Sequence, residues 1–107
     1  MAKSPKDILE RWRENVPPET PKEDVERVVE FYFPGMFRYQ EGTSHWLSIT
    51  DPMLAKADAA GYDTGTTKGS GRIQLAHKHG RTVKKVYVSN LVTAINLKEA
   101  IEKAKLE

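Results

Sequence analysis

The chain of 107 residues contains no cysteine. This absence excludes disulfide bonds, thiolate metal ligands and a cysteine nucleophile. Long apolar runs are also missing, because none approaches the roughly 20 residues that a membrane-spanning helix needs. The first residues, Met-Ala-Lys-Ser-Pro-Lys-Asp, lack the apolar core of a secretion signal. We therefore expect a cytoplasmic protein without a membrane partner.

A large overall excess of one charge is missing as well, since 17 basic side chains stand against 15 acidic ones and the net charge is +2. The local distribution is less even. Every charged residue from position 68 to position 85 is basic: Lys68, Arg72, Lys78, Arg81, Lys84 and Lys85. Such a stripe of cations is typical of a phosphate-binding surface. The alternative is a solvated hairpin whose lysines only deter pairing at a sheet edge.

Two helices are predicted near the N-terminus. Ser4 and Pro5 mark the start of an accessory helix over residues 5–15, which a pair of prolines ends. A capping box from Thr20 to Glu23 marks the start of the second helix. The apolar face of this second helix carries Val25, Val28, Val29 and Tyr32.

Strands are predicted where apolar and polar residues alternate. Residues 36–41 and 44–50 form one such pair, with a turn at Gly42 between them. Residues 72–78 alternate again. Their inward face would carry Ile73, Leu75 and His77.

The C-terminal third leaves one alternative open. Residues 82–95 begin either as a returning strand or as a helix, and the β-branched side chains up to position 88 favour a strand with Val86 and Val88 inward. The apolar residues Leu91, Val92 and Ile95 and those after Asn96 do not fall on one continuous helical face. We therefore expect a break there, with Asn96 and Glu99 capping a separate final helix.

Residues 51–71 are predicted to be an insertion loop with a short helical turn at 53–60. Their glycine-rich end lacks the Gly-Lys-Ser/Thr sequence of a phosphate-binding loop, so nucleotide binding is not expected. The whole chain is then a single α+β domain with its core in residues 20–50 and 72–107. Its antiparallel sheet of three or four strands would have the helices on one face.

The segment Gly42-Thr43-Ser44-His45-Trp46 is the best candidate for chemistry. An imidazole can serve as a general base or a general acid near neutral pH. Ser44 would anchor a phosphate oxygen. The alternative is that His45 is a hydrogen-bonded histidine at the rim of the core, because it shares a face with two apolar residues.

A second imidazole is expected close by. If strands 44–50 and 72–78 are antiparallel neighbours, the start of one lies beside the end of the other, which brings His45 near His77. The two rings would divide the acid and base roles. A metal site with His79 ranks last, since no carboxylate is near in sequence, and we expect neither metal nor cofactor. The alternative for His77 and His79 is a polar hairpin tip.

Several segments together resemble the HicA toxins, small ribonucleases of bacterial toxin–antitoxin pairs. The residues that carry the resemblance are Pro21-Lys22-Glu23-Asp24-Val25, Phe37-Arg38-Tyr39-Gln40, the Gly-Thr-Ser-His-Trp segment and Leu97-Lys98-Glu99-Ala100-Ile101-Glu102-Lys103-Ala104. The resemblance implies a fold like that of double-stranded-RNA-binding domains, with an α-β-β-β-α core and here an extra N-terminal helix. It also implies an mRNA-cleaving enzyme with His45 as general acid or base, and a HicB-like antitoxin as partner.

RNA contacts are expected from a polar and cationic set of side chains. This set is Arg38, Ser44, Arg72, Lys78, Arg81, Lys84 and Lys85. Alternation turns Trp46 away from the helices, where it would stack a base or be covered by the insertion or a partner chain. Two other functions stay open, a non-catalytic RNA-binding module and a protein-docking module, and a homo-oligomer is not excluded.

Overall fold

The computed structural model describes residues 4–43, 45–61, 71–78 and 80–106. Predictions for Ser44, Lys68 and His79, and for most of the glycine-rich segment, concern residues outside these ranges. The elements follow one another as α1 (Pro5–Glu14), β1 (Glu19–Pro21), α2 (Lys22–Tyr32), β2 (Phe37–Tyr39), β3 (Leu47–Thr50), α3 (Pro52–Ala59), β4 (Arg72–Leu75), β5 (His77–Lys78), β6 (Thr82–Lys84) and α4 (Lys85–Leu106).

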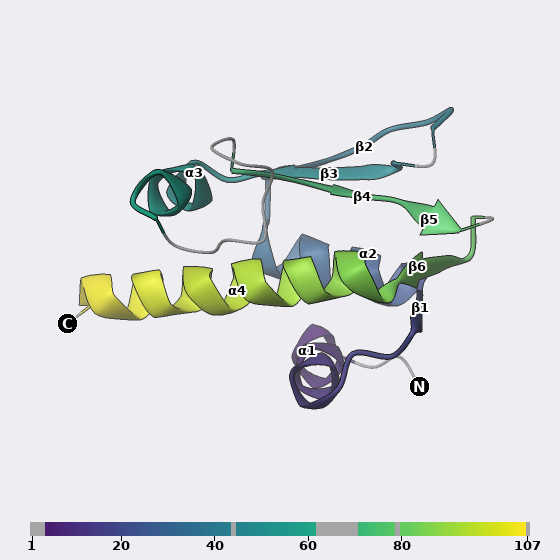
Figure 1. Cartoon of the computed structure of the whole chain (residues 1–107), viewed down its shortest axis with the longest axis horizontal. Coiled ribbons are helices and arrows are strands. Elements are labelled where there is room, and N and C mark those ends of the chain that lie inside the picture. Colours follow the sequence, from purple (N-terminus) through teal and green to yellow (C-terminus); the bar gives the residue numbers. More distant parts are fainter. Residues whose placement is uncertain (1–3, 44, 62–70, 79, 107) are drawn as a thin grey trace.

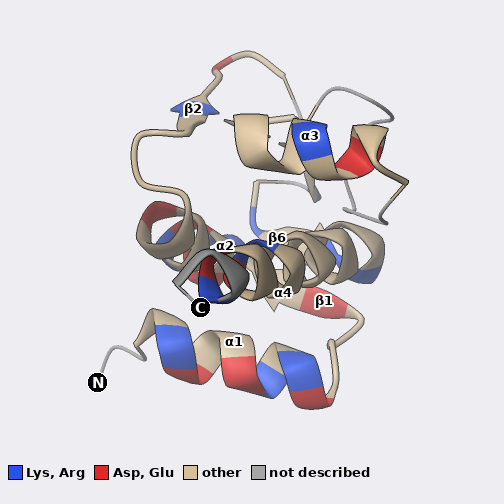
Figure 2. Ribbon diagram, turned by 90° about the vertical axis from the view of Figure 1, so that its left-hand side faces the viewer, with Lys and Arg blue, Asp and Glu red and all other residues tan. Residues whose placement is uncertain are grey.

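The fold is α+β, as predicted. Strands β2, β3 and β4 form an antiparallel three-stranded sheet, and β1, β6 and β5 form a second, smaller one. Figure 1 shows α2 and α4 side by side against one face of the larger sheet, with α1 beneath them. Figure 2 shows the same layers end-on, and it shows basic and acidic residues interspersed along α1.

The register of the larger sheet fixes which side chains reach the core. Leu47 pairs with Leu75 and Ile49 with Ile73, and all four are buried against the helices. Phe37 pairs with Ile49 on the same face. This confirms the predicted alternation in all three strands. The outward positions of these three strands are polar: Arg38, Ser48, Thr50, Arg72 and Gln74.

Helix α1 contributes to the same core. Ser4 Oγ accepts a hydrogen bond from the backbone N–H of Asp7 at 3.1 Å, which caps the helix as Ser-Pro predicts. The buried side chains of α1 are Ile8, Leu9 and Trp12. One side of α1 therefore packs into the hydrophobic core.

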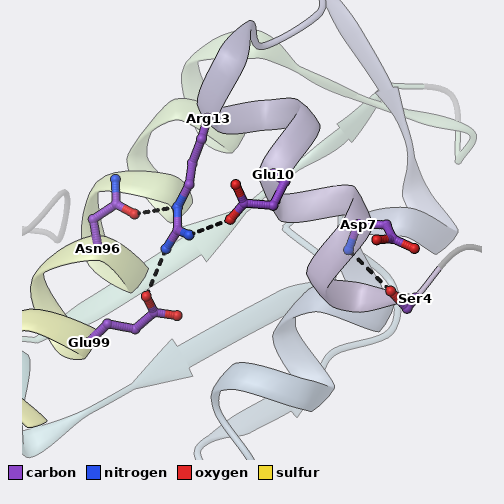
Figure 3. A network of polar contacts seen from close by, with 6 residues as sticks. All are labelled: Ser4, Asp7, Glu10, Arg13, Asn96 and Glu99. Atoms are coloured by element: carbon purple, nitrogen blue, oxygen red, sulfur yellow. Dashed lines mark hydrogen bonds and ion pairs between the residues drawn. The ribbon is translucent and has the colours of Figure 1, made fainter. Parts of the chain in front are cut away.

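Arg13 links the C-terminal end of α1 to α4 through hydrogen bonds and an ion pair (Figure 3). Its guanidinium donates to Asn96 Oδ1 at 2.8 Å, to Glu10 Oε1 at 2.7 Å and to Glu99 Oε2 at 2.9 Å. Burial alone would lower the pKa of Arg13, but the hydrogen bonds to Glu99 and Glu10 outweigh it and raise the pKa. The fork geometry of arginine suits such convergent carboxylates.

The second predicted helix is confirmed as α2, but its predicted capping box is wrong. Thr20 belongs to β1, where it pairs with Val83, and its buried Oγ1 has no hydrogen-bond partner among the described residues. The helix instead begins after Pro21 without a side-chain cap. The N–H of Lys22 donates to the carbonyl of Arg81 at 3.0 Å, so the neighbouring β-hairpin supplies the acceptor.

The single strand predicted over 72–78 is divided between the two sheets. β4 ends at Leu75, and after Ala76 the chain continues as β5, in which His77 pairs with Val83 of β6. The physical reason lies in β3, which begins only at Leu47 and therefore offers no partner beyond Leu75. The backbone at 77–78 finds its hydrogen bonds in the other sheet.

The predicted break at Asn96 is wrong, because α4 is one helix from Lys85 to Leu106. The strand at 82–88 ends at Lys84, and Val86 is 58% exposed instead of inward. The apolar phase changes because Lys98, only 8% exposed, occupies the inward position that follows Ile95. The ammonium group of Lys98 has polar partners inside the protein, so the helix continues through this position.

The insertion is not a loop throughout, because α3 occupies residues 52–59. Asp51 caps this helix, with Oδ1 accepting from the N–H of Met53 at 2.9 Å. Leu54 and Ala57 are buried, so α3 adds to the core. The predicted helical turn at 53–60 is confirmed in slightly different bounds. Among the described helices, none is long and apolar enough to cross a membrane.

Candidate functional site

The predicted site residues gather mainly at one end of the molecule. The β2–β3 connection, the β5–β6 turn and the start of α4 lie together at the right-hand end in Figure 1, opposite α3. This places His45, His77 and the cations after position 77 on neighbouring segments. The antiparallel pairing of β3 with β4 is what brings the two histidine-bearing segments to the same end.

His45 is exposed on the turn between β2 and β3. Gly42 adopts a left-handed φ of 76°, which lets the chain reverse there at little cost. The N–H of His45 donates to Thr43 Oγ1 at 3.3 Å, so the hydroxyl of Thr43 helps to shape the turn. The side chain of His45 is exposed to solvent, so a large substrate could reach it.

His77 is half-buried at the start of β5. The backbone N–H of Gly80 donates to Nδ1 of His77 at 2.9 Å. Because this nitrogen accepts a hydrogen bond, the proton of the neutral ring is assigned to Nε2. His77 therefore offers a hydrogen-bond donor, whereas a base needs a free ring nitrogen.

The expected nearness of His45 and His77 assumed that the pairing of β3 with β4 continues past Leu47 and Leu75, which would set position 45 opposite position 77. The chain leaves the larger sheet before His77, however. The ring that lies against His77 is that of Trp46, with a centroid separation of 5.6 Å and a tilted arrangement.

The predicted orientation of Trp46 is wrong. The ring is 5% exposed and turns toward α2, where its Nε1–H donates to Glu26 Oε2 at 2.9 Å. The Nζ of Lys22 lies 5.5 Å from the centroid of the same ring. The alternation failed here because Trp46 precedes β3, and consecutive residues outside a paired strand need not point to opposite faces.

Glu26 and Lys22 are the site residues that the sequence analysis missed. They are four residues apart on α2 and therefore lie on one face of the helix. In the sequence they are indistinguishable from the solvated charges of any surface helix. Only the tertiary contact with Trp46 identifies them.

Four of the predicted cations belong to this end. Lys78, Arg81, Lys84 and Lys85 are exposed on β5, the following turn, β6 and the start of α4. Lys78 pairs with Glu19 at 3.2 Å, and with Arg81 and Thr82 these two residues line a shallow pocket of about 440 Å³. These cations lie beside the N-terminus of α4, where the helix dipole contributes a partial positive charge.

Two predicted RNA contacts lie elsewhere. Arg38 is on β2 and Arg72 is at the start of β4, and both are in register positions that face away from the helices. Arg72 pairs with Thr50, at the end of the sheet remote from β5. The structure therefore does not bring Arg38 and Arg72 into the cationic cluster at 78–85.

A buried ion pair at the opposite end forms a second notable cluster. Lys98 Nζ lies 3.2 Å from Asp51 Oδ2, donates to the carbonyl of Tyr32 at 3.0 Å and sits 4.6 Å from the ring centroid of Phe33. Asp51 Oδ2 has this ionic contact but no aligned hydrogen bond. Cavities of about 510 and 590 Å³ share Met36 as a wall and open beside the pair.

Neither a metal site nor a similarity to a known protein assigns a function to this chain. Within the described ranges, no three His, Asp or Glu side chains gather closely enough to hold a metal ion together. No model of a protein family, no curated protein and no solved structure matches the chain.

Proposed function

We propose that this chain is an RNA-binding endoribonuclease of the HicA-like kind, with His45 as its general acid or base. The observation that carries the proposal is the exposed His45 on the β2–β3 turn, at the same end of the molecule as the cations at 78–85. An imidazole open to solvent beside a phosphate-binding surface has the two properties that metal-free RNA cleavage requires.

The order of elements supports the same proposal. Helix α2, strands β2, β3 and β4 and helix α4 occur in this order along the chain, with α3 between β3 and β4 and with β5 and β6 before α4, and α2 and α4 lie on one face of the sheet. Such a surface would meet RNA through its backbone and 2′-hydroxyls more than through its bases. The cations of β5, β6 and α4 would then position the RNA, and the β2–β3 turn would reach the sugar.

The chemistry follows from the state of the two rings. His45 takes the proton of a 2′-hydroxyl, and the 2′-oxygen attacks the adjacent phosphorus while the bond to the 5′-oxygen breaks. His77, which carries its proton on Nε2, donates a hydrogen bond to the phosphate or to the departing 5′-oxygen. The departing 5′-oxygen takes a proton from water, and His45 returns the proton that it accepted to the solvent. The products are a 2′,3′-cyclic phosphate and a free 5′-hydroxyl.

Cleavage of labelled RNA in the presence of a metal chelator tests this proposal. The full chain is expected to cleave, and His45→Ala is expected to cleave about 100-fold or more slowly while it still binds RNA. Gln40→Ala on the same hairpin is the matched control, because Gln40 is exposed and carries no titratable group. Equal unfolding midpoints would show that all three proteins are folded.

Other outcomes separate the alternatives. An unmodified chain that binds RNA without cleaving it is a non-catalytic RNA-binding module, since the cations at 78–85 do not need His45. A chain that neither binds nor cleaves RNA contradicts the proposal and favours a protein-docking module. The resemblance further predicts that expression of the chain stops bacterial growth and that a HicB-like partner restores it.

A further inference from the structure

One buried indole links three separate parts of the end of the molecule that carries His45 and His77, which we call the histidine end. Trp46 immediately follows His45 in the chain, its ring lies against His77, and its Nε1–H is bonded to Glu26 of α2. At 5% exposure Trp46 is the first buried residue after the exposed turn. No other aromatic contact in the described residues involves a histidine.

We propose that Trp46, held in place by Glu26, is the positioning residue of this site and sets the orientation of His77 and the path of the chain at His45. Its effect on catalysis rests on the proposed function, whereas its effect on the two histidines does not. Neither Trp46 nor Glu26 is required to touch the RNA.

The contacts of Trp46 fix it as a rigid support. An indole N–H is a donor only, and when buried it needs an acceptor, which the carboxylate of Glu26 supplies at 2.9 Å. The backbone is anchored too, because the carbonyl of Trp46 accepts from the N–H of Gln40 at 2.8 Å. Side chain and backbone together hold the start of β3, so the exposed turn begins from a fixed point.

His77 is restrained on two sides by this arrangement. The N–H of Gly80 donates to its Nδ1, and the centroid of the Trp46 ring lies 5.6 Å from the centroid of the imidazole, with the two rings tilted. Rotation of the imidazole about its Cβ–Cγ bond would break the first contact and disturb the second. The Nε2–H is therefore held in one direction, which is what a donor to a phosphate requires.

The helix offers a matched comparison one turn further on. Glu30 Oε2 accepts a hydrogen bond from the hydroxyl of Tyr39 at 3.0 Å, much as Glu26 accepts from Trp46. Both pairs join α2 to the β2–β3 hairpin, but only the Trp46 pair adjoins the histidines. Variants of Glu30 and Tyr39 therefore lose the same kind of bond without loss of the positioning contact.

Nuclear magnetic resonance of the free protein tests the structural part. In Glu26→Ala and Trp46→Phe the ring-proton resonances of His77 are expected to move or broaden, and the backbone amide of His45 is expected to shift. Glu26→Gln, which keeps an acceptor, is expected to restore the original spectrum. Glu30→Ala is expected to leave the histidine signals in place. Unchanged histidine signals in folded Glu26→Ala and Trp46→Phe would overturn the inference.

RNA cleavage tests the catalytic part. Glu26→Ala is expected to lower kcat about 10- to 100-fold with little change in KM, because a displaced ring affects the reaction more than RNA binding. Glu26→Gln is expected to recover most of the rate, and Glu30→Ala to keep it. Displaced histidine signals with an unchanged kcat would overturn the positioning role. If the unmodified chain does not cleave RNA, the proposed function fails, and the resonance experiment still decides whether Trp46 positions His77.

Discussion

Gly71, the residue before β4, has no room for a side chain. A Cβ atom built there would lie 2.5 Å from the carbonyl oxygen of Asp51 and 2.8 Å from the backbone nitrogen of Ala55, and its φ is +67°. Gly71→Ala is therefore expected to lower the free energy of unfolding by about 2–4 kcal/mol, from the clash and the left-handed backbone together. Urea-induced unfolding measures the change.

Gly80→Ala separates the two causes. Its φ is +69°, but a Cβ atom there would meet nothing within 4 Å. This variant is expected to lose only about 1 kcal/mol, which is the backbone contribution. Equal losses in the two variants would show that the close approach to Asp51 does not matter.

Tyr39 gives the protein a dependence on alkaline pH. Burial raises the pKa of the Tyr39 phenol above its ordinary value of 10.0, and the hydrogen bond to Glu30 raises it further. The folded protein therefore keeps a proton that the unfolded chain releases above this pH, so stability falls as the pH rises through that range. Tyr39→Phe cannot ionise and is expected to fall less steeply.

The comparison requires unfolding midpoints of both proteins at pH values below and above 10.0. Lysine ionisation contributes equally to both proteins and cancels in the difference. Parallel pH profiles for the unmodified chain and Tyr39→Phe would contradict the expectation.

At the scale of elements, the ion pair between Lys98 and Asp51 joins α4 to the junction of β3 and α3. Both side chains are almost fully enclosed, with exposed fractions of 10% and 2%. Lys98→Met leaves the carboxylate buried without its counter-charge and is expected to cost about 3–5 kcal/mol of unfolding free energy.

A second substitution is expected to return part of that loss. Asp51→Asn keeps an oxygen for the N–H of Met53 and removes the charge, so the double variant is expected to regain at least about 2 kcal/mol over Lys98→Met. A double-mutant cycle by urea unfolding measures the coupling. Additive losses would mean that the two charges do not stabilise one another.

The lengths and contacts of the elements also explain which of them the sequence predicts. Helices α1 and α2 and strands β2, β3 and β4 carry clear apolar periods bounded by proline, glycine or aspartate, and they lie close to their predicted positions. β1 has three residues, one of them proline, and β5 has two. Segments this short have no period, so neither β1 nor the separation of β5 from β4 could be predicted, although β6 lies within the strand predicted from residue 82.

Two single residues account for the main errors. Lys98 is polar in the sequence but occupies a core position, so α4 seemed to end at Asn96 when it continues. Trp46 stands one residue before β3, where alternation no longer applies. Its partner Glu26 is 20 residues away, and a contact at that separation leaves no local signal.

At the scale of the whole molecule, the charge distribution predicts how RNA binding responds to salt. The cations at 78–85 lie at one end, remote from Lys56 on α3. Replacement of Lys84 and Lys85 by glutamine is expected to reduce the slope of log affinity against log salt concentration by about 1–2, since each phosphate contact contributes about 0.7–0.9.

Lys56→Gln is the control for this prediction. It removes one positive charge, at the far end of the molecule, and is expected to leave the slope unchanged. A slope that responds equally to both changes would mean that RNA is attracted by net charge alone and has no defined contact surface. Titrations at several salt concentrations measure the slopes.

The passage of residues 72–78 from one sheet to the other has a consequence for the way the protein opens. Leu75 is hydrogen-bonded in the larger sheet and His77 in the smaller, with only Ala76 between them. A force or fluctuation that pulls either sheet apart is transmitted along this covalent stretch to its neighbour. We therefore expect the two sheets to open together, so that the segments carrying His45 and His77 lose their structure along with β4.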